Sequence, residues 1–108
     1  TLNAEPAGTL NSYWMVTAVL SPDFGLDKFA MMQALAARNI DSRPFFTPLS
    51  RLPAFADRLQ ARRFLPESPR GHAIASHGVN LPSGYNMTEP LVDLVCRAVR
   101  EILAEGLI

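Results

Sequence analysis

Hydrophobic and polar positions along the chain fall into blocks that predict short strands and amphipathic helices. Residues 12–20 are aromatic and β-branched, and both alternating sets of side chains are largely apolar. This pattern predicts a central strand covered on both faces. A helix is expected at residues 27–38, with Asp27 as its N-cap, Asn39 in the left-handed conformation that ends helices, and Ile40 folded back onto it.

Apolar residues at three- and four-residue steps predict one buried stripe on each of two helices. In the helix at residues 27–38, the predicted stripe is Phe29, Met32, Leu35 and Ala36. In the last helix, which Thr88 caps and Gly106 ends, it is Leu91, Leu94, Val95, Ala98, Val99, Ile102 and Leu103. The single cysteine, Cys96, falls within this pattern, so we expect it to pack as a small hydrophobic residue.

The segments between these elements carry proline and glycine signals. Residues 41–47 are predicted to be extended, and Pro44 favours a sheet edge because it lacks a backbone donor. Residues 48–66 are typical of a wrapping loop with some helical turns. A helix capped by Ser68 should run to His77, where Gly78 ends it, and a short strand is expected at residues 79–81.

This order of elements predicts a mixed fold of the α/β (α+β) class, a small sheet with helices packed on it. Residues 1–11 have no periodicity, so we expect an arm or linker, followed by a single small domain at residues 12–108. A sheet this small leaves much of its second face uncovered. Another chain segment or a partner subunit is therefore expected on that face.

Composition narrows the function classes. The chain has 108 residues and a formal net charge of zero, so nothing favours nonspecific attraction to nucleic acid or to an anionic membrane. No apolar run reaches the length of a membrane span, and the first residues do not resemble a signal peptide. These features indicate a cytoplasmic protein.

The sequence offers no complete set of catalytic residues. It contains no glycine-rich phosphate loop, no paired metal-ligand spacing and no nucleophile elbow. His72 and His77 are five residues apart, which favours a solvated pair over a metal site. Lys28 is expected to be an exposed ammonium rather than a Schiff-base lysine, and nothing marks Cys96 as a nucleophile. We therefore predict no catalytic, cofactor-binding or metal-binding residue in this chain.

The roles of three residues each have two interpretations. Arg43 precedes Pro44 and two phenylalanines, where its guanidinium could be presented to an anion, or it could simply pair with Asp41 or a helix C-terminus. Aromatic residues in strands are most often core residues, which is the commoner interpretation of Tyr13 and Trp14. Such rings also line ligand clefts.

Four motifs occur in a fixed order: NSYWM at residues 11–15, NIDSRPFFTPL at 39–49, LPAF at 52–55 and GVNLPS at 78–83. Together they resemble the C-terminal part of the DegT/DnrJ/EryC1/StrS family of pyridoxal-phosphate-dependent nucleotide-sugar aminotransferases, and within it the perosamine-synthase-like branch. The resemblance extends over nearly the whole chain. It implies that residues 12–108 are the C-terminal small domain of an aspartate-aminotransferase-type (fold type I) enzyme.

In such enzymes the cofactor lysine and the other groups that hold pyridoxal phosphate come from a preceding large domain, and the subunits dimerise. The resemblance therefore implies three partners: the large pyridoxal-phosphate-binding domain, a second subunit and the nucleotide-sugar substrate. The isolated chain would bind no cofactor. Its parent enzyme would transfer an amino group from an amino acid, glutamate in our expectation, to a keto-sugar nucleotide.

The resemblance also implies substrate-binding roles. Trp14 stands where many family members have a substrate-facing His, and Arg43 matches a recurrent Arg. Phe45 and Phe46 match the aromatic or His positions just after that Arg. Tyr13 precedes Trp14 in the same motif. The two departures from His favour a perosamine-type pocket.

Two hypotheses follow. In the first, the chain is a substrate-side lobe of a sugar aminotransferase, inactive by itself. In the second, it is a free-standing binding or regulatory module that kept the lobe's fold, and it associates with itself or with an intact aminotransferase. The coding sequence upstream of Thr1 distinguishes them, because only the first requires an in-frame large domain with a cofactor lysine.

Overall fold

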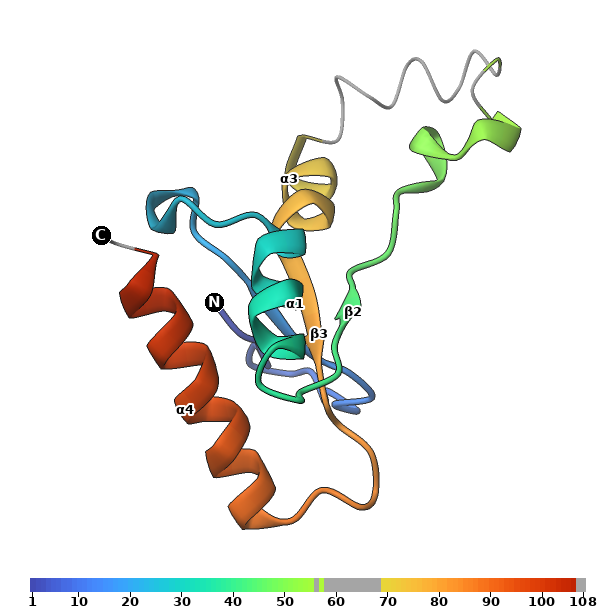
Figure 1. Cartoon of the computed structure of the whole chain (residues 1–108). Coiled ribbons are helices and arrows are strands. Elements are labelled where there is room, and N and C mark those ends of the chain that lie inside the picture. Colours follow the sequence, from blue (N-terminus) through green and yellow to red (C-terminus); the bar gives the residue numbers. More distant parts are fainter. Residues whose placement is uncertain (56, 58–68, 107–108) are drawn as a thin grey trace.

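The structure, a computed structural model, describes residues 1–55, 57 and 69–106. One antiparallel sheet has the strand order β1-β3-β2, and Figure 1 shows helices packed on it. The strands are β1 (Val16–Val19), β2 (Arg43–Pro44) and β3 (Gly78–Leu81). The α-helices of the described residues are α1 (Lys28–Ala36), α3 (Pro69–His77) and α4 (Glu89–Glu105). The predicted class, a small sheet with helices packed on it, is confirmed in its α+β form.

The central strand is β3, so the prediction of a central strand at residues 12–20 is wrong. Strand β1 begins only at Val16 and lies at one edge, and none of its residues is fully buried. The outer edge of β1 is occupied by the start of the chain, where Thr1 and Val19 exchange two backbone hydrogen bonds. The apolar residues on both faces of residues 12–20 therefore do not indicate burial on both sides. Tyr13 and Trp14 precede the strand, and both are exposed.

Strand β2 lies at the opposite edge, as the proline predicted. It is only two residues long, and its register places Arg43 opposite Asn80 and Pro44 opposite Val79. Strands β1 and β2 both run antiparallel to β3, so they are parallel to each other with β3 between them. Helix α1 makes the crossover between the two edges, which makes this unit a split β-α-β arrangement.

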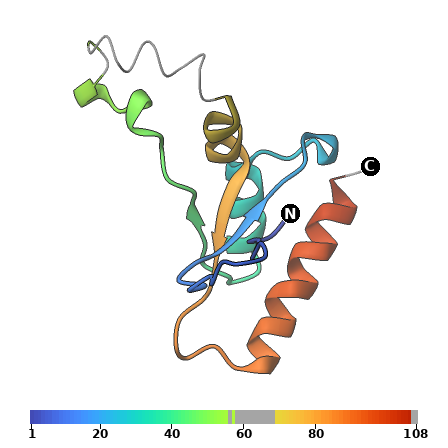
Figure 2. The ribbon, with the colours of Figure 1, turned by 180° about the vertical axis from the view of Figure 1, so that it is seen from behind.

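The core lies on the face of the sheet that α1 and α4 cover. Val79 points into it from β3 and is fully buried, together with Met31 and Leu35 of α1. Because side chains alternate along a strand, Gly78 and Asn80 face the opposite side. Figure 2 shows that side, with β1, β3 and the first residues of the chain in front of α1.

The ends of α1 form as predicted, whereas its buried stripe is rotated. Asp27 caps the helix by accepting from the N–H of Ala30 at 2.8 Å. At the other end Asn39 has a φ of 58°, and Ile40 donates back to the carbonyl of Leu35 at 3.0 Å. The buried side chains are Met31 and Leu35, and the expected core residues Phe29 and Ala36 are exposed.

Helix α4 packs with a narrower stripe than predicted. Val95, Ala98 and Ile102 are buried, and Val99 and Leu103 are partly buried against them. Leu91 and Leu94 are each 43% exposed, because this end of α4 extends beyond the elements that cover it (Figure 1). Cys96 is also exposed, so its predicted packing is wrong. Gly106 ends the helix, as expected, by donating to the carbonyl of Ile102.

The segment after β2 leads away from the sheet toward α3 and carries two 3₁₀ turns, η2 (Leu49–Arg51) and η3 (Pro53–Phe55) (Figure 1). These turns agree with the predicted loop with helical turns, although residues 56 and 58–68 of that loop lie outside the described residues, as does the predicted cap Ser68. No helix in the described ranges is long and apolar enough to cross a bilayer.

Gly78 allows β2 to approach β3 closely. A Cβ atom added to Gly78 would lie 2.6 Å from Cβ of Phe45 and 2.8 Å from the carbonyl oxygen of Ile74. We therefore expect Gly78→Ala to lower the free energy of unfolding by about 1–3 kcal/mol, because the backbone must shift to accept the methyl group. Urea unfolding followed by circular dichroism measures this change.

Gly71 in α3 is the matched control, because a Cβ there would meet no atom within 4 Å. Gly71→Ala should raise the free energy of unfolding by roughly 0.5–1 kcal/mol, since alanine favours the helix. Equal effects of the two substitutions would contradict the close approach at Gly78.

Candidate functional site

Three aromatic rings form a surface cluster beside the sheet. The rings of Trp14 and Phe46 are stacked, with centroids 6.4 Å apart and planes inclined by 22°. Phe45 is tilted against Phe46 at 5.8 Å and 59°. Trp14 is 71% exposed and Phe46 is 56% exposed. We call Trp14, Phe45 and Phe46 the aromatic cluster; it offers flat apolar surface to solvent, so its most exposed rings are not core residues.

The backbone on both sides of the sheet holds this cluster. Tyr13 has a φ of 48°, and its N–H donates to Oδ1 of Asn11 at 2.8 Å, which turns the chain immediately before β1. The carbonyl of Trp14 accepts from Oγ of Ser83 at 3.4 Å. On the other edge, the N–H of Phe45 donates to the carbonyl of Gly78 at 2.9 Å, which fixes Phe45 over β3.

Arg43 lies on the same strand as the start of the phenylalanine pair. Its side chain is 79% exposed, and its guanidinium is 3.5 Å from the carboxylate of Asp41, which is itself 83% exposed. The simple pairing with Asp41 therefore exists, but an exposed pair of this kind is weak and leaves the guanidinium accessible. Arg43 and Asp41 line a groove of about 230 Å³ together with Met15 and Asn80.

The structure thus brings together two of the four predicted site residues, Trp14 and Phe45, through Phe46. Phe46 was matched to a family position by the resemblance but was not among the predicted site residues. Arg43 is next to this pair in sequence and lines the neighbouring groove. Tyr13 is 51% exposed and takes part in no ring pair of the described residues. The signal for Phe46 was present in the chain, since it directly follows Phe45 in the RPFF motif.

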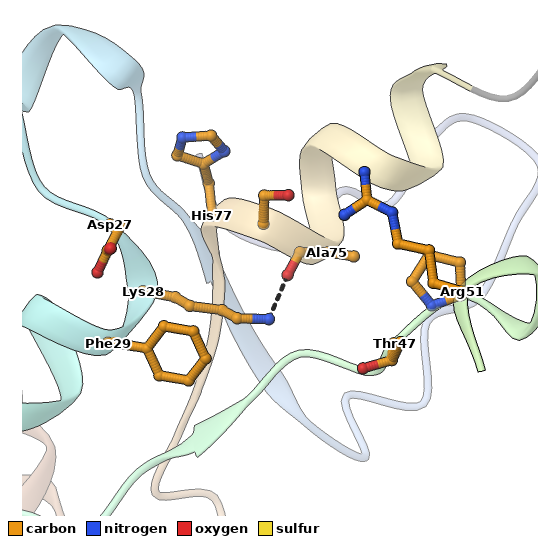
Figure 3. Close-up of a pocket in the computed structure, with 9 residues that line it drawn as sticks. Asp27, Lys28, Phe29, Thr47, Arg51, Ala75 and His77 are labelled. Atoms are coloured by element: carbon orange, nitrogen blue, oxygen red, sulfur yellow. Dashed lines mark hydrogen bonds between the residues drawn. The ribbon is translucent and has the colours of Figure 1, made fainter. Parts of the chain in front are cut away.

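A second hollow, of about 390 Å³, lies between α1, α3 and the segment after β2 (Figure 3). Its lining includes Lys28 and Phe29 from the first turn of α1, Thr47 and Arg51 from the segment after β2, and Ala75 from α3. We call this hollow the basic pocket. The sequence reading did not find it, because its walls come from three separated parts of the chain.

Lys28 is not the exposed ammonium that the sequence suggested. It is partly buried, and its Nζ donates to the carbonyl oxygen of Ala75 at 2.6 Å. The same Nζ is 5.3 Å from the centroid of the Phe29 ring. Lys28 therefore provides a hydrogen-bond donor to a backbone carbonyl in the last turn of α3. A cation is favourable there because the C-terminal end of a helix carries partial negative charge.

His72 differs from the predicted solvated pair. It is 7% exposed, and its Nε2 lies 3.2 Å from Oγ of Ser50, so it connects α3 to η2. Its Nδ1 is buried and has no hydrogen-bond partner among the described residues. His77 instead lies 3.1 Å, by its Nδ1, from the carbonyl of Ala73. No group of three metal-ligating side chains occurs within the described ranges.

The described residues form a small α+β domain with an exposed aromatic cluster, and the comparisons assign the chain to a family. The profile of the DegT/DnrJ/EryC1/StrS aminotransferase family matches residues 1–100. The chain therefore belongs to this family.

Individual relatives agree with that assignment. The chain is 28% identical over 99 residues, 92% of its length, to GDP-perosamine synthase of Vibrio cholerae, and 22% identical over 104 residues to GDP-perosamine synthase of Escherichia coli O157:H7. It is also 35% identical over 88 residues, 79% of its length, to EpsN of Bacillus subtilis (strain 168), named as a proposed pyridoxal phosphate-dependent aminotransferase. The matches cover 26%, 26% and 21% of these proteins, so the chain spans about a quarter of the length of its relatives.

The described residues do not form a site for pyridoxal phosphate. The cofactor needs a lysine amine that can form an imine, and Lys28, the single lysine, directs its Nζ to the carbonyl of Ala75. The neighbouring carboxylate of Asp27 accepts from the N–H of Ala30 and serves as the helix cap. Both groups are thus engaged by the backbone in this structure.

The face of the sheet that carries Arg43 also carries a partly buried hydrogen bond between two strands. Asn80, opposite Arg43, is 7% exposed, and its Oδ1 accepts from Oγ1 of Thr17 at 2.7 Å. Thr17→Val keeps the side-chain shape and leaves this acceptor without its donor. We expect a loss of about 1–3 kcal/mol in the free energy of unfolding, measured in urea.

Thr9→Val is the control, since the hydroxyl of Thr9 bonds only to the exposed carbonyl of Pro6. It should change stability by no more than about 0.5 kcal/mol. If both variants unfold at the same urea concentration as the parent, Asn80 is satisfied in another way.

Proposed function

We propose that this chain is the C-terminal, substrate-side lobe of a pyridoxal-phosphate-dependent nucleotide-sugar aminotransferase and has no transaminase activity by itself. Membership in the family and the quarter-length matches to its relatives support this proposal. The catalytic lysine and the cofactor then belong to the remaining three quarters of the enzyme. When bound there, pyridoxal phosphate supplies the electron sink for the amino transfer.

The observation that carries the proposal is the exposed aromatic cluster beside Arg43. A flat aromatic face attracts the weakly positive C–H edges of a sugar ring or the π-face of a base. An arginine fork binds phosphate oxygens or carbonyl oxygens of such a ligand. Trp14, Phe45 and Arg43 thus combine the two kinds of contact that a nucleotide sugar requires, and Tyr13 stands at the border of the same surface.

This surface binds and orients, and it does not carry out the reaction. The rings of Trp14 and Phe46 exclude water from one side of the ligand, while Arg43 fixes its direction. Family members with other sugars often have His where Trp14 and Phe45 stand, so the all-aromatic surface favours a perosamine-type keto sugar. The names of two relatives, both GDP-perosamine synthases, support this choice.

The proposed substrate surface is tested in the full-length enzyme that carries this chain, by measuring the two half-reactions of the amino transfer separately. Trp14→Ala and Arg43→Ala should each lower kcat/KM for the keto-sugar nucleotide by roughly tenfold or more, because each removes a contact worth about 1–3 kcal/mol. The half-reaction with the amino donor glutamate, followed by the absorbance of the cofactor, should stay unchanged.

Arg97→Ala on the outer side of α4 is the matched control and should leave both half-reactions unchanged. Equal losses in the two half-reactions for Trp14→Ala would indicate a folding defect. Unchanged sugar kinetics for both site variants would remove these residues from the substrate surface.

The predicted inactivity of the lobe has its own test. The 108-residue chain is incubated with pyridoxal phosphate and treated with borohydride, and the mass of the peptide containing Lys28 is measured. We expect no stoichiometric adduct, because the amine of Lys28 is held by the carbonyl of Ala75. A stoichiometric, Lys28-specific adduct would contradict the proposal that cofactor chemistry resides elsewhere.

A further inference from the structure

The segment after β2 is held by two hydrogen bonds to other elements within the described residues. At its start, the N–H of Phe45 donates to the carbonyl of Gly78 at 2.9 Å. Farther along, Oγ of Ser50 lies 3.2 Å from Nε2 of His72. Residues 46–49 stand between these two bonds, and in the described part of the chain their hydrogen bonds stay inside the segment. The position of this stretch is therefore set by the anchors on either side.

Both anchors belong to one continuous piece of the fold. Helix α3 ends at His77 and β3 begins at Gly78, so the helix passes into the strand without a linker. The helix is also tied to α1, because Nζ of Lys28 donates to the carbonyl of Ala75 at 2.6 Å. One anchor lies at Gly78 and the other at His72, within this same unit. They therefore hold the segment after β2 in a common frame.

We propose that His72 is a positioning residue for the aromatic cluster, which through Ser50 keeps Phe46 stacked on Trp14. The two rings come from opposite edges of the sheet, and their centroids are 6.4 Å apart. Phe46 is 56% exposed, so burial does little to hold it there. Without the Ser50 bond, the next anchor that the structure describes along the chain is Pro69, where α3 begins. A longer free stretch has more conformations, and holding the ring in one of them then costs more entropy.

The surroundings of His72 favour this role over a purely stabilising one. The residue is 7% exposed, and its buried Nδ1 has no hydrogen-bond partner in the part of the chain that the structure describes. A buried polar atom without a partner lowers stability, and a leucine of similar size avoids that loss. Buried polar groups can instead select one arrangement of the chain. The other ring nitrogen, Nε2, contacts Ser50 and so specifies where the segment after β2 lies.

The role of His72 is indirect. His72 lines neither the groove beside Arg43 nor the basic pocket, so it acts through the rings and not on a ligand. Its effect on sugar binding rests on the proposed function, whereas its effect on the stacked rings does not. The two effects are therefore measured separately.

The first experiment reads the stack in the 108-residue chain by NMR. Trp14 is the single tryptophan, so its indole N–H gives one resonance in a proton–nitrogen correlation spectrum. The Phe46 ring shifts this resonance, and Phe46→Ala defines its position without the stack. We expect Ser50→Ala and His72→Leu to move the resonance most of the way from the parent position to the Phe46→Ala position. His72→Leu should also unfold at the parent temperature or above, because it leaves no buried polar atom unpaired.

Conservative variants and a matched control accompany this measurement. Ser50→Thr keeps the hydroxyl and His72→Gln keeps a polar group near the position of Nε2, so both should retain the parent resonance. Ser76→Ala is the control, because the hydroxyl of Ser76 bonds inside α3 to the carbonyl of His72 at 2.9 Å. If His72→Leu does not fold, Ser50→Ala against Ser50→Thr decides the question. A resonance that stays at the parent position in Ser50→Ala, or that moves equally in Ser76→Ala, overturns the inference.

The second experiment measures the consequence in the full-length enzyme that carries this chain. His72→Leu should lower kcat/KM for the keto-sugar nucleotide by roughly threefold or more, because the ring is misplaced, and should leave the glutamate half-reaction unchanged. Normal sugar kinetics in His72→Leu beside impaired kinetics in Trp14→Ala would overturn the positioning role. If the resonance moves but Trp14→Ala leaves the sugar kinetics unchanged, His72 still positions the rings, and the proposed substrate surface is the part that fails.

Discussion

The alternation of side chains along β3 determines how the rest of the molecule is arranged. Val79 enters the core between α1 and the sheet, and the two neighbouring positions, Gly78 and Asn80, face the other side. Gly78 has no side chain, so β2 can approach with Phe45 directly above it. The same strand therefore anchors the core on one face and supports the candidate ligand surface on the other.

This arrangement leaves one face of the sheet without a helical layer in the part of the chain that the structure describes. Both helices that pack on the sheet, α1 and α4, cover the same face, so the face of Asn80 and Arg43 has no helical layer from the described residues. Loop ends at the two sheet edges place their rings there instead. The proposed ligand surface therefore has one wall among the described residues, and a concave site needs a second wall from elsewhere.

Features that depend on a few neighbouring residues were predictable from the sequence. The cap at Asp27, the left-handed stop at Asn39 and the helix end at Gly106 are set by local hydrogen bonding and backbone preference, and all three occur as expected. The edge position of Pro44 is local in the same sense, because proline lacks a backbone donor.

Features that depend on distant packing were not predictable in this way. The exposure of Phe29 and Leu91, and the burial of His72 against Ser50, depend on which elements lie opposite them. The strand order was also missed, since the apolar residues before β1 resembled a central strand. Of the site, the RPFF motif led to Arg43 and Phe45, but the stacking of Trp14 on Phe46 joins residues from opposite edges of the sheet.

The aromatic cluster and the basic pocket follow from one stretch of backbone. After β2 the chain passes Phe46, whose ring meets Trp14, and then Thr47, which lines the pocket beside Lys28. The hydrogen bond between Ser50 and His72 holds the next turn against α3. Flat apolar contact and cationic donors are therefore fixed within a few residues of each other, and the sheet edge at Arg43 sets where both begin.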